Sequence, residues 1–169
     1  EESNELLKRL DSDNGGMPLF TSCCPAWVHY CEKNYPELLP HVSTCRSPMQ
    51  MFASVIKAQN EPISSRKHVH VAIMPCTAKK YEATRSEFTF GDSPAVDYVV
   101  STQGLIRMIK EAGIVFSELE PEAVDMPYST MTGAGVLFGV TGGVAEAVLR
   151  RVCYDKSSTS LKALSFTGV

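Results

Sequence analysis

Apolar residues recur along the chain with two different periods. Over residues 2–10 three leucines fall on one side of a helical wheel, and Glu5 and Arg9 fall on another. This period of three to four residues is typical of an amphipathic helix. Over residues 68–74 valine and isoleucine alternate with histidine and alanine, and a period of two predicts a strand.

Turn and cap signals place the other elements. Proline suits the first turn of a helix, so Pro25 and Pro48 are expected to begin helices. Thr102 and Thr141 are the expected amino caps of two more. The expected helices cover residues 25–33, 48–60, 103–112 and a stretch from 141 to about 152, with another from about 78. The expected short strands cover residues 17–21, 96–100 and 161–169, and a turn is expected at 13–16. Strands that alternate with helices predict an α/β fold, part of a domain with a largely parallel sheet flanked by helices.

Composition narrows the class of protein. The chain has 169 residues, is 44% hydrophobic, and carries 16 Lys+Arg against 19 Asp+Glu for a net charge of −3. One domain or part of one is expected, and the absence of a basic run argues against a nucleic-acid partner. Residues 126–145 hold no charge but hold five glycines, which predicts a buried loop leading into a helix rather than a membrane span. Both ends of the sequence look like cuts through a larger protein, and residues 1–13 lack the pattern of a signal peptide.

Six cysteines are the main candidates for chemistry: Cys23, Cys24, Cys31, Cys45, Cys76 and Cys153. A disulfide framework suits a short, secreted, loop-rich chain, which this composition does not indicate. Buried thiols, a zinc site and iron-sulfur ligation are the other interpretations. Three of the six (Cys31, Cys45 and Cys153) have no informative neighbours and are interpreted as structural thiols.

Cys24 and Cys76 occupy equivalent places in the expected topology. Cys24 stands at the start of the helix that Pro25 opens, and Cys76 follows a strand and precedes a helix. Parallel sheets gather such turns at one edge, where ligands bind. Lys79, one helical turn after Cys76, can place its ammonium over the same crevice. Two sulfur ligands and a cation suit a soft metal centre that carries anionic groups, with buried thiols as the alternative.

Three segments resemble, in the right order, the catalytic domain of iron-only (FeFe) hydrogenases. They are TSCCPAW at 21–27, MPCTAKKYEA at 74–83 and GAGVLFGVTGG at 133–143. The resemblance covers essentially the whole chain and implies the fold of the hydrogenase H-domain. It also implies interconversion of protons and hydrogen at an H-cluster. That cofactor is a 4Fe-4S cubane joined by a cysteine to a diiron subsite with CO, cyanide and a bridging dithiolate amine.

The resemblance implies roles for individual residues. Cys24 and Cys76 would be two of the four cysteines of the cubane site, and Cys23 would exchange protons with the bridging amine. Lys79 would hold a cyanide ligand. The wall of the cofactor pocket would include Met74, Pro75, Ser47, Met49 and Phe138.

The family also moves protons along a relay, and its pattern carries onto Cys23, Glu5, Ser43, Glu2 and Arg9. The spacing of Glu2, Glu5 and Arg9 places them on one face of a helix. The alternative interpretation is an ordinary solvated helix face, which is where this spacing usually occurs.

The match has departures and a gap. Ala26 replaces the usual Gly, Met49 stands where many members have Gln, and Ala145 replaces a common Met. The third cysteine motif is expected beyond Val169. Residues 1–169 would then be part of an H-cluster-binding domain, and alone they are expected to be inactive. The resemblance also implies ferredoxin or a similar low-potential electron carrier and maturation proteins as partners, no membrane association, and a cytoplasmic location with the periplasm as the alternative.

Other classes compete with a catalytic hydrogenase. Related iron-sulfur assembly proteins typically lack the cysteine at the position of Cys23, and sensory hydrogenases tend to replace it. Cys23 therefore favours a catalyst. A dinucleotide loop at residues 133–139 is disfavoured because no strand pattern precedes it. A zinc module is disfavoured because the adjacent Cys23 and Cys24 lack the usual gap between ligands.

Overall fold

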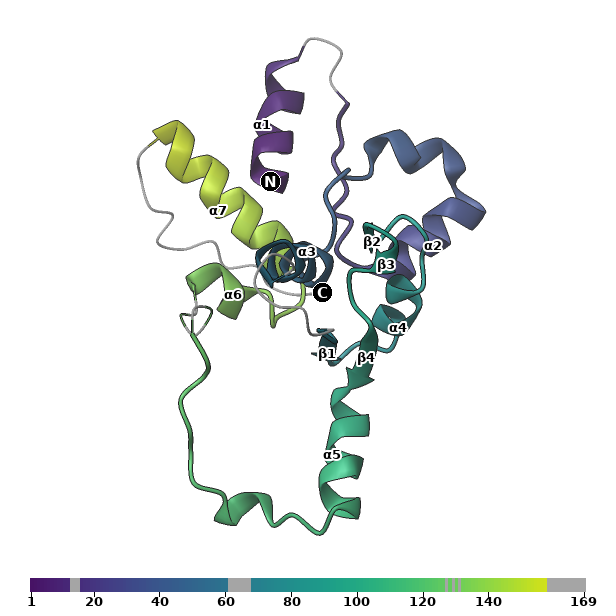
Figure 1. The fold of residues 1–169 in the computed structure, drawn as a ribbon. Helices are drawn as coiled ribbons and strands as arrows, with labels where there is room; N and C mark the ends of the chain where they lie inside the picture. Colours follow the sequence, from purple (N-terminus) through teal and green to yellow (C-terminus); the bar gives the residue numbers. More distant parts are fainter. Residues whose placement is uncertain (13–15, 61–67, 127, 129, 131, 158–169) are drawn as a thin grey trace. The chain divides into compact units, whose positions relative to one another are not determined.

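A computed structural model describes residues 1–12, 16–60, 68–126, 128, 130 and 132–157. Figure 1 labels the α-helices and the strands. In chain order the elements are α1 (Glu2–Asp11), α2 (Pro25–Asn34), the 3-10 helix η1 (Pro36–His41), α3 (Pro48–Asn60), β1 (Val71–Met74), α4 (Ala78–Ala83), β2 (Thr89–Phe90), β3 (Ser93–Pro94), β4 (Tyr98–Ser101), α5 (Thr102–Glu111), the 3-10 helix η2 (Phe116–Glu118), α6 (Gly133–Leu137) and α7 (Gly143–Ser157). The contacts divide the chain into two units. The first unit comprises Glu1–Ser22, Cys31–Cys45 and Glu122–Val169, and the second comprises Cys23–Tyr30 and Arg46–Pro121.

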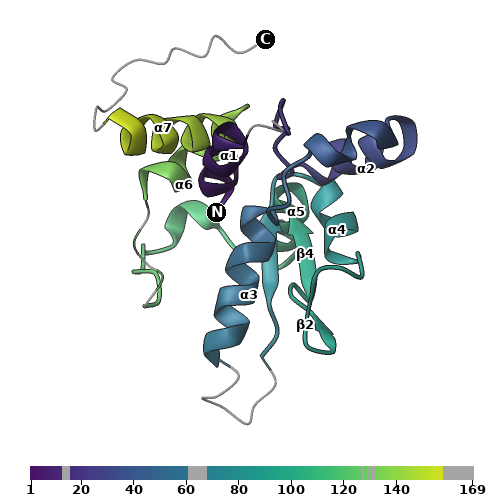
Figure 2. The same ribbon diagram turned by 90° about the horizontal axis from the view of Figure 1, so that it is seen from above.

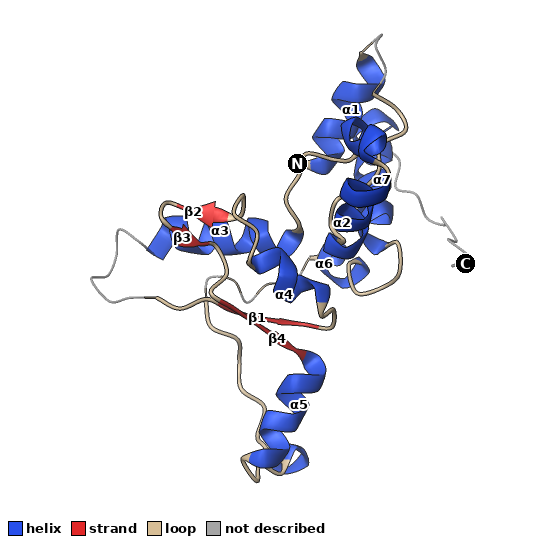
Figure 3. Cartoon of the chain, turned by 90° about the vertical axis from the view of Figure 1, so that its right-hand side faces the viewer, coloured by secondary structure: helices blue, strands red, loops and turns tan. Residues whose placement is uncertain are grey.

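The second unit contains a small parallel sheet. β1 pairs with β4 from Val71 opposite Tyr98 to Met74 opposite Ser101, and β4 leads directly into α5, as Figure 3 shows. α4 packs against β4, and α5 packs against both strands. β2 and β3 form a short antiparallel pair. The expected α/β fold with parallel strands and flanking helices is therefore confirmed.

Small residues and one buried lysine fix α3 in the second unit. Ala53, Ala95 and Val96 form the buried core, and Ala72 and Met49 pack against it. The Nζ of Lys57 on α3 donates to the hydroxyl of Ser93 at 3.1 Å and to the carbonyl of Pro94. It also lies 3.9 Å from the carboxylate of Asp97. These contacts tie the helix to the chain around β3, beside which it lies in Figure 3.

Helices α1, α6 and α7 belong to the first unit. α7 packs against both of the others (Figure 2). Elsewhere in the unit the N–H of Phe20 donates to the carbonyl of His41, and the N–H of Ser43 donates to the carbonyl of Phe20, both at 2.8 Å. The pairing of Phe20 with Val42 is a single parallel bridge.

The strands are shorter than predicted. The strand expected at residues 17–21 is only the bridge at Phe20, and Pro18, which has no N–H, cannot extend the ladder. The strand expected at 68–74 begins at Val71, because the backbone N–H of His70 donates to the side chain of Asp97 at 2.8 Å instead of to a strand. The strand expected at 96–100 spans Tyr98–Ser101. The strand expected at 161–169 and most of the turn at 13–16 lie outside the described residues.

The apolar alternation of β1 faces outward. Val71 and Ile73 are each 54% exposed, and Tyr98 on β4 is 64% exposed. Ala72, from the other face, packs against the buried core. The smaller side chain is therefore the partly buried one, in a cluster that includes Met49 and Ala53 of α3.

The starts of two helices, and the exposure of residues 126–145, also differ from the sequence predictions. Ser101, not Thr102, caps α5, and its hydroxyl accepts the N–H of Gly104 at 3.1 Å. α7 begins at Gly143 rather than after Thr141, because Gly142 adopts φ 73°, which interrupts the helix. Residues 126–145 were expected to be a buried loop, but they contain α6, and Val136 is 63% exposed. Among the described helices none is long and apolar enough to cross a membrane.

Candidate functional site

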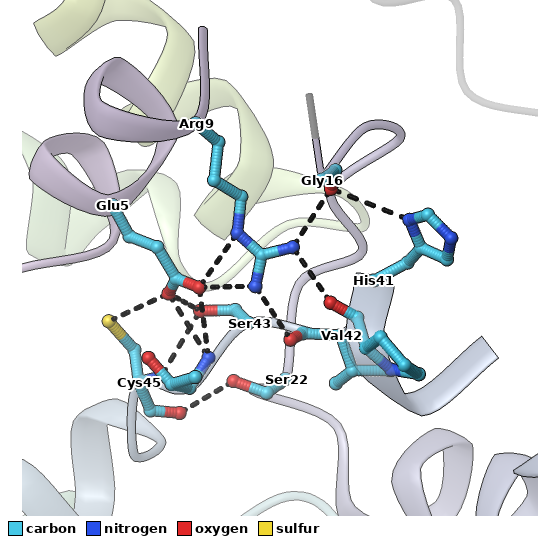
Figure 4. Close-up of polar contacts among 10 residues, drawn as sticks. Glu5, Arg9, Gly16, Ser22, His41, Val42, Ser43 and Cys45 are labelled. Carbon is cyan, nitrogen blue, oxygen red and sulfur yellow. Dashed lines mark hydrogen bonds and ion pairs between the residues drawn. The ribbon is translucent and has the colours of Figure 1, made fainter. Parts of the chain in front are cut away.

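Glu5 on α1 is the centre of a polar cluster in the first unit, drawn in Figure 4. Its Oε1 accepts hydrogen bonds from Nε and Nη2 of Arg9 at 3.0 and 2.6 Å. Its Oε2 accepts from the hydroxyl of Ser43 at 2.7 Å and from the N–H of Thr44 at 3.1 Å. Because Glu5 and Arg9 are four residues apart on the helix, their side chains are neighbours and can form an ion pair. Chain segments far apart in the sequence thus converge on one carboxylate.

Arg9 uses every N–H of its guanidinium. Besides Glu5, it donates from Nη1 to the carbonyls of Gly16 at 2.9 Å and Pro40 at 3.0 Å, and from Nη2 to the carbonyl of Val42 at 3.2 Å. Arginine keeps its proton in proteins. In this geometry Arg9 anchors Glu5 and the surrounding backbone and has no donor to spare.

The two carboxylates of α1 have opposite properties. Burial tends to raise the pKa of Glu5, but hydrogen bonds from Ser43, Arg9 and Thr44, with the charge of Arg9, outweigh it and lower that pKa. Burial, with a smaller contribution from the charge of Glu5, raises the pKa of Glu2 against the effect of the Ser43 hydroxyl. The Oε1 of Glu2 is buried and has no hydrogen-bond partner among the described residues. Glu2 therefore takes up a proton more readily than Glu5 does.

Cys45 also belongs to this cluster, although the sequence did not predict its place there. Its Sγ lies 3.7 Å from Oε2 of Glu5, and its N–H donates to the hydroxyl of Ser43 at 3.1 Å. Burial and the charges of the two glutamates raise the pKa of the Cys45 thiol, so it stays protonated at neutral pH. The residues next to Cys45 in the sequence gave no sign of this contact, because Glu5 lies 40 positions away. By contrast, Cys31 is fully buried, with its thiol 3.4 Å from the carbonyl of Tyr35.

In the second unit, Cys24 stands at the start of α2, as expected. Its Sγ accepts the N–H of Trp27 at 3.5 Å, the bond that an amino-capping side chain makes. Cys24 is exposed. The residue therefore presents a sulfur atom at the positive end of a helix.

Lys79 connects the two cysteine motifs. Cys76 is exposed in the turn between β1 and α4, and Lys79 lies in the first turn of α4. Its Nζ donates to the carbonyl of Cys23 at 2.7 Å and to Oε2 of Glu82 at 3.0 Å. The turn after β1 and the segment before α2 are thereby held together within the second unit.

Ser47 is buried and hydrogen-bonded within the second unit. It is 1% exposed, its hydroxyl donates to Oε2 of Glu82 at 3.0 Å, and it accepts the N–H of Gln50 at 3.4 Å. Its hydrogen and one lone pair are thus used within the protein. Sequence reasoning missed Glu82 and Gln50, although the Ser-x-x-Gln pattern at the start of a helix was a signal for the second.

The remaining predicted wall residues belong to both units. Met74 ends β1 and is half-buried, Pro75 follows it and is exposed, and Met49 packs against the core of the second unit. Phe138 lies at the end of α6 in the first unit and is 42% exposed.

The donor set fits part of an iron-sulfur site. Among the described residues, His, Cys, Asp and Glu form no group of three or more that could hold a metal ion. Cys24 and Cys76 can supply two exposed sulfur ligands, and Lys79 supplies a cation beside the first motif. Both amide atoms of Gln50 are buried without a partner in the described part of the chain. A cluster held here would need its other ligands from elsewhere.

Comparisons with known proteins agree on one protein family. The family described as "Iron only hydrogenase large subunit, C-terminal domain" matches residues 1–169. All of the chain aligns with NADP-reducing hydrogenase subunit HndD of Solidesulfovibrio fructosivorans at 41% identity, and with iron hydrogenase 1 of Clostridium pasteurianum at 44%. The chain spans 30% of the length of each of these relatives.

Two further comparisons bear on function. Cytosolic iron-sulfur assembly component 3 of Bos taurus is 36% identical over 92% of the chain, which spans 35% of that protein. A solved FeFe-hydrogenase structure, from a study of oxygen inactivation at the 2Fe subcluster, matches with a TM-score of 0.83 and 41% identity. The match covers all of this chain and 43% of the hydrogenase chain.

Proposed function

The chain belongs to the family of iron-only hydrogenase large subunits, C-terminal domain, and we propose that it is part of a hydrogenase that reversibly reduces protons to molecular hydrogen. Residues 1–169 would form part of the H-cluster-binding domain. Hydrogenase relatives at 41% and 44% identity support the proposal.

The single observation that carries the proposal is the arrangement around Lys79. The bond from its Nζ to the carbonyl of Cys23, at 2.7 Å, brings an ammonium to the Cys23-Cys24 motif. Cys24 and Cys76 would ligate the cubane, and Lys79 would attract an anionic cyanide ligand. The H-cluster, when bound, would supply the redox chemistry and the site where hydrogen forms.

Proton delivery is assigned to the polar cluster of the first unit. Glu2, with its raised pKa, would exchange protons with solvent, and the hydroxyl of Ser43 can both donate and accept. Glu5 accepts from that hydroxyl at 2.7 Å, and Arg9 holds Glu5 in place. The final step, to the thiol of Cys23, follows the pattern of the family. In this scheme Arg9 positions the relay and does not itself transfer a proton.

An iron-sulfur assembly protein is the second candidate, and a sensory hydrogenase is a variant of the first without turnover. The similarity to the assembly component of Bos taurus, 36% over 92% of the chain, favours the second candidate. Cys23 favours a catalyst over both, because assembly and sensory members typically lack a thiol at this position.

The proposed partners are ferredoxin or a similar low-potential electron carrier and the proteins that mature the H-cluster. The proposed compartment is the cytoplasm or the periplasm, and one relative is named a periplasmic hydrogenase. The 169 residues alone would be inactive, because two sulfur ligands cannot hold a cubane that requires four.

The test begins with the gene on both sides of this sequence. A downstream Cys followed four residues later by another Cys, near a Gly-rich turn, is expected. The complete protein, matured and purified, should evolve hydrogen from reduced methyl viologen. A complete protein that holds a cubane but evolves no hydrogen would support the assembly or sensory alternative.

A further inference from the structure

Glu82 is a buried carboxylate for which the proposed chemistry has no direct use. It lies on α4 and is 2% exposed. A single oxygen, Oε2, accepts from Nζ of Lys79 and from the hydroxyl of Ser47, each at 3.0 Å. A buried charge is costly unless it is paired and hydrogen-bonded, and both conditions are met here.

Lys79 depends on this partner. Its side chain is 8% exposed and lies three residues before Glu82 on the same helix. The ammonium donates to Glu82 on one side and to the carbonyl of Cys23 on the other. Without Glu82, the ammonium of Lys79 would have only the neutral carbonyl of Cys23 as an acceptor. Its positive charge would then have no negative partner.

Ser47, which caps the start of α3, fixes the orientation of Glu82. A hydroxyl has one hydrogen to donate. The oxygen of Ser47 already accepts the N–H of Gln50 at 3.4 Å, which orients the hydroxyl, and its hydrogen goes to Glu82. The carboxylate is therefore held by two different helices.

We propose that Glu82 is a positioning residue that holds the ammonium of Lys79 against the Cys23-Cys24 motif, with Ser47 as its support. The role for the H-cluster rests on the proposed function, in which Lys79 holds a cyanide ligand. The buried Ser47-Glu82-Lys79 chain itself is a property of the second unit and is testable separately.

The first experiment uses the complete protein without its cofactor. Reductive methylation, followed by mass spectrometry, gives the relative reactivity of Lys79, with the exposed Lys80 as internal reference. Glu82→Gln keeps the shape but removes the charge, so Lys79 should react about tenfold faster, the factor for one lost charge-assisted hydrogen bond. Glu87→Gln is the matched control, because Glu87 pairs with Arg85 at the surface of the same unit, and it should leave Lys79 unchanged. An unchanged Lys79 rate in Glu82→Gln would overturn the proposal.

The second experiment uses the matured complete protein and its infrared bands of bound cyanide. Glu82→Gln should retain iron but shift the cyanide bands and slow hydrogen evolution, and Glu82→Asp should restore part of both. Ser47→Ala, which removes only the supporting donor, should shift the same bands by less. Wild-type bands and turnover in Glu82→Gln and Ser47→Ala would refute the positioning role. Absence of cyanide bands from the unmodified protein would instead refute the proposed function, and the methylation result would still decide the Lys79-Glu82 pair.

Discussion

At the scale of single residues, two adjacent cysteines have different surroundings and different expected tasks. Cys24 presents its sulfur at the start of α2, where it accepts the N–H of Trp27 at 3.5 Å. Cys23 is half-buried, and its carbonyl is held by Lys79. The proposed function assigns iron ligation to Cys24 and proton exchange to Cys23.

Substitution should separate these tasks in the complete protein. Cys24→Ala removes a proposed ligand, so cluster iron should be lost together with activity. Cys23→Ala should keep the iron and lose most turnover, by roughly 100-fold or more, as expected when a proton-transfer group is removed. Iron content and hydrogen evolution, measured on the same preparations, test this. Equal loss of iron in both variants would contradict the division of tasks.

The charge of Glu5 predicts a pH dependence of local stability. Its pKa is lowered from the ordinary value of 4.5 in the folded protein. The stabilisation it gives is therefore complete above that value and is lost as the pH falls through the lower, folded pKa. The amide of Thr44, which donates to Glu5 at 3.1 Å, should lose its protection from hydrogen exchange over that acidic range. In Glu5→Gln the protection factor should be lower at neutral pH and independent of pH, and a wild-type profile there would contradict the assignment.

Sequence reasoning reached the charged residues but not their partners. The helical spacing of Glu5 and Arg9 predicted that they share one face of a helix, and the structure pairs them there. It did not predict Cys45 or Glu82, because their neighbours come from distant segments. The sulfur of Cys45 meets a residue 40 positions away, and Ser47 meets one 35 positions away. Contacts of this kind follow from the tertiary fold and leave no local pattern.

At the scale of elements, prolines were reliable markers and caps were not. Pro25 and Pro48 begin α2 and α3 as predicted. The cap of α5 is Ser101 instead of Thr102, since either residue type can cap a helix and the last pair of the β1 and β4 register, at Ser101, fixes where the strand ends. The short strands could not be bounded from sequence, because the side chain of Asp97 competes for the N–H of His70.

The amino cap of α5 can be tested by comparing substitutions at two neighbouring residues, Ser101 and Thr102. Ser101→Ala removes the acceptor of the Gly104 N–H and should destabilise the first turn of α5 by about 1 kcal/mol. Thr102→Ala, at the predicted but unused cap, should have little effect because alanine favours helices. Hydrogen exchange of the amides in the first turn of α5, in the complete protein, measures both. A larger loss in Thr102→Ala than in Ser101→Ala would show that the cap is misassigned.

At the scale of the whole molecule, the chain matches only part of each relative. It spans 30% of the hydrogenase relatives and 43% of the matched FeFe-hydrogenase chain. The sequence motifs identified the family and two candidate ligands, Cys24 and Cys76, because those motifs are local and specific. The remaining ligands could not be identified, since no group of three or more metal-binding side chains forms among the described residues.

The central claim is that Cys24 and Cys76 help to hold an H-cluster. The most direct measurement is the infrared spectrum of the matured complete protein, unmodified and as Cys76→Ala. The account predicts bands of bound CO and cyanide in the unmodified protein and their loss in Cys76→Ala. An unmodified protein that contains its full iron but shows no CO or cyanide bands would contradict it.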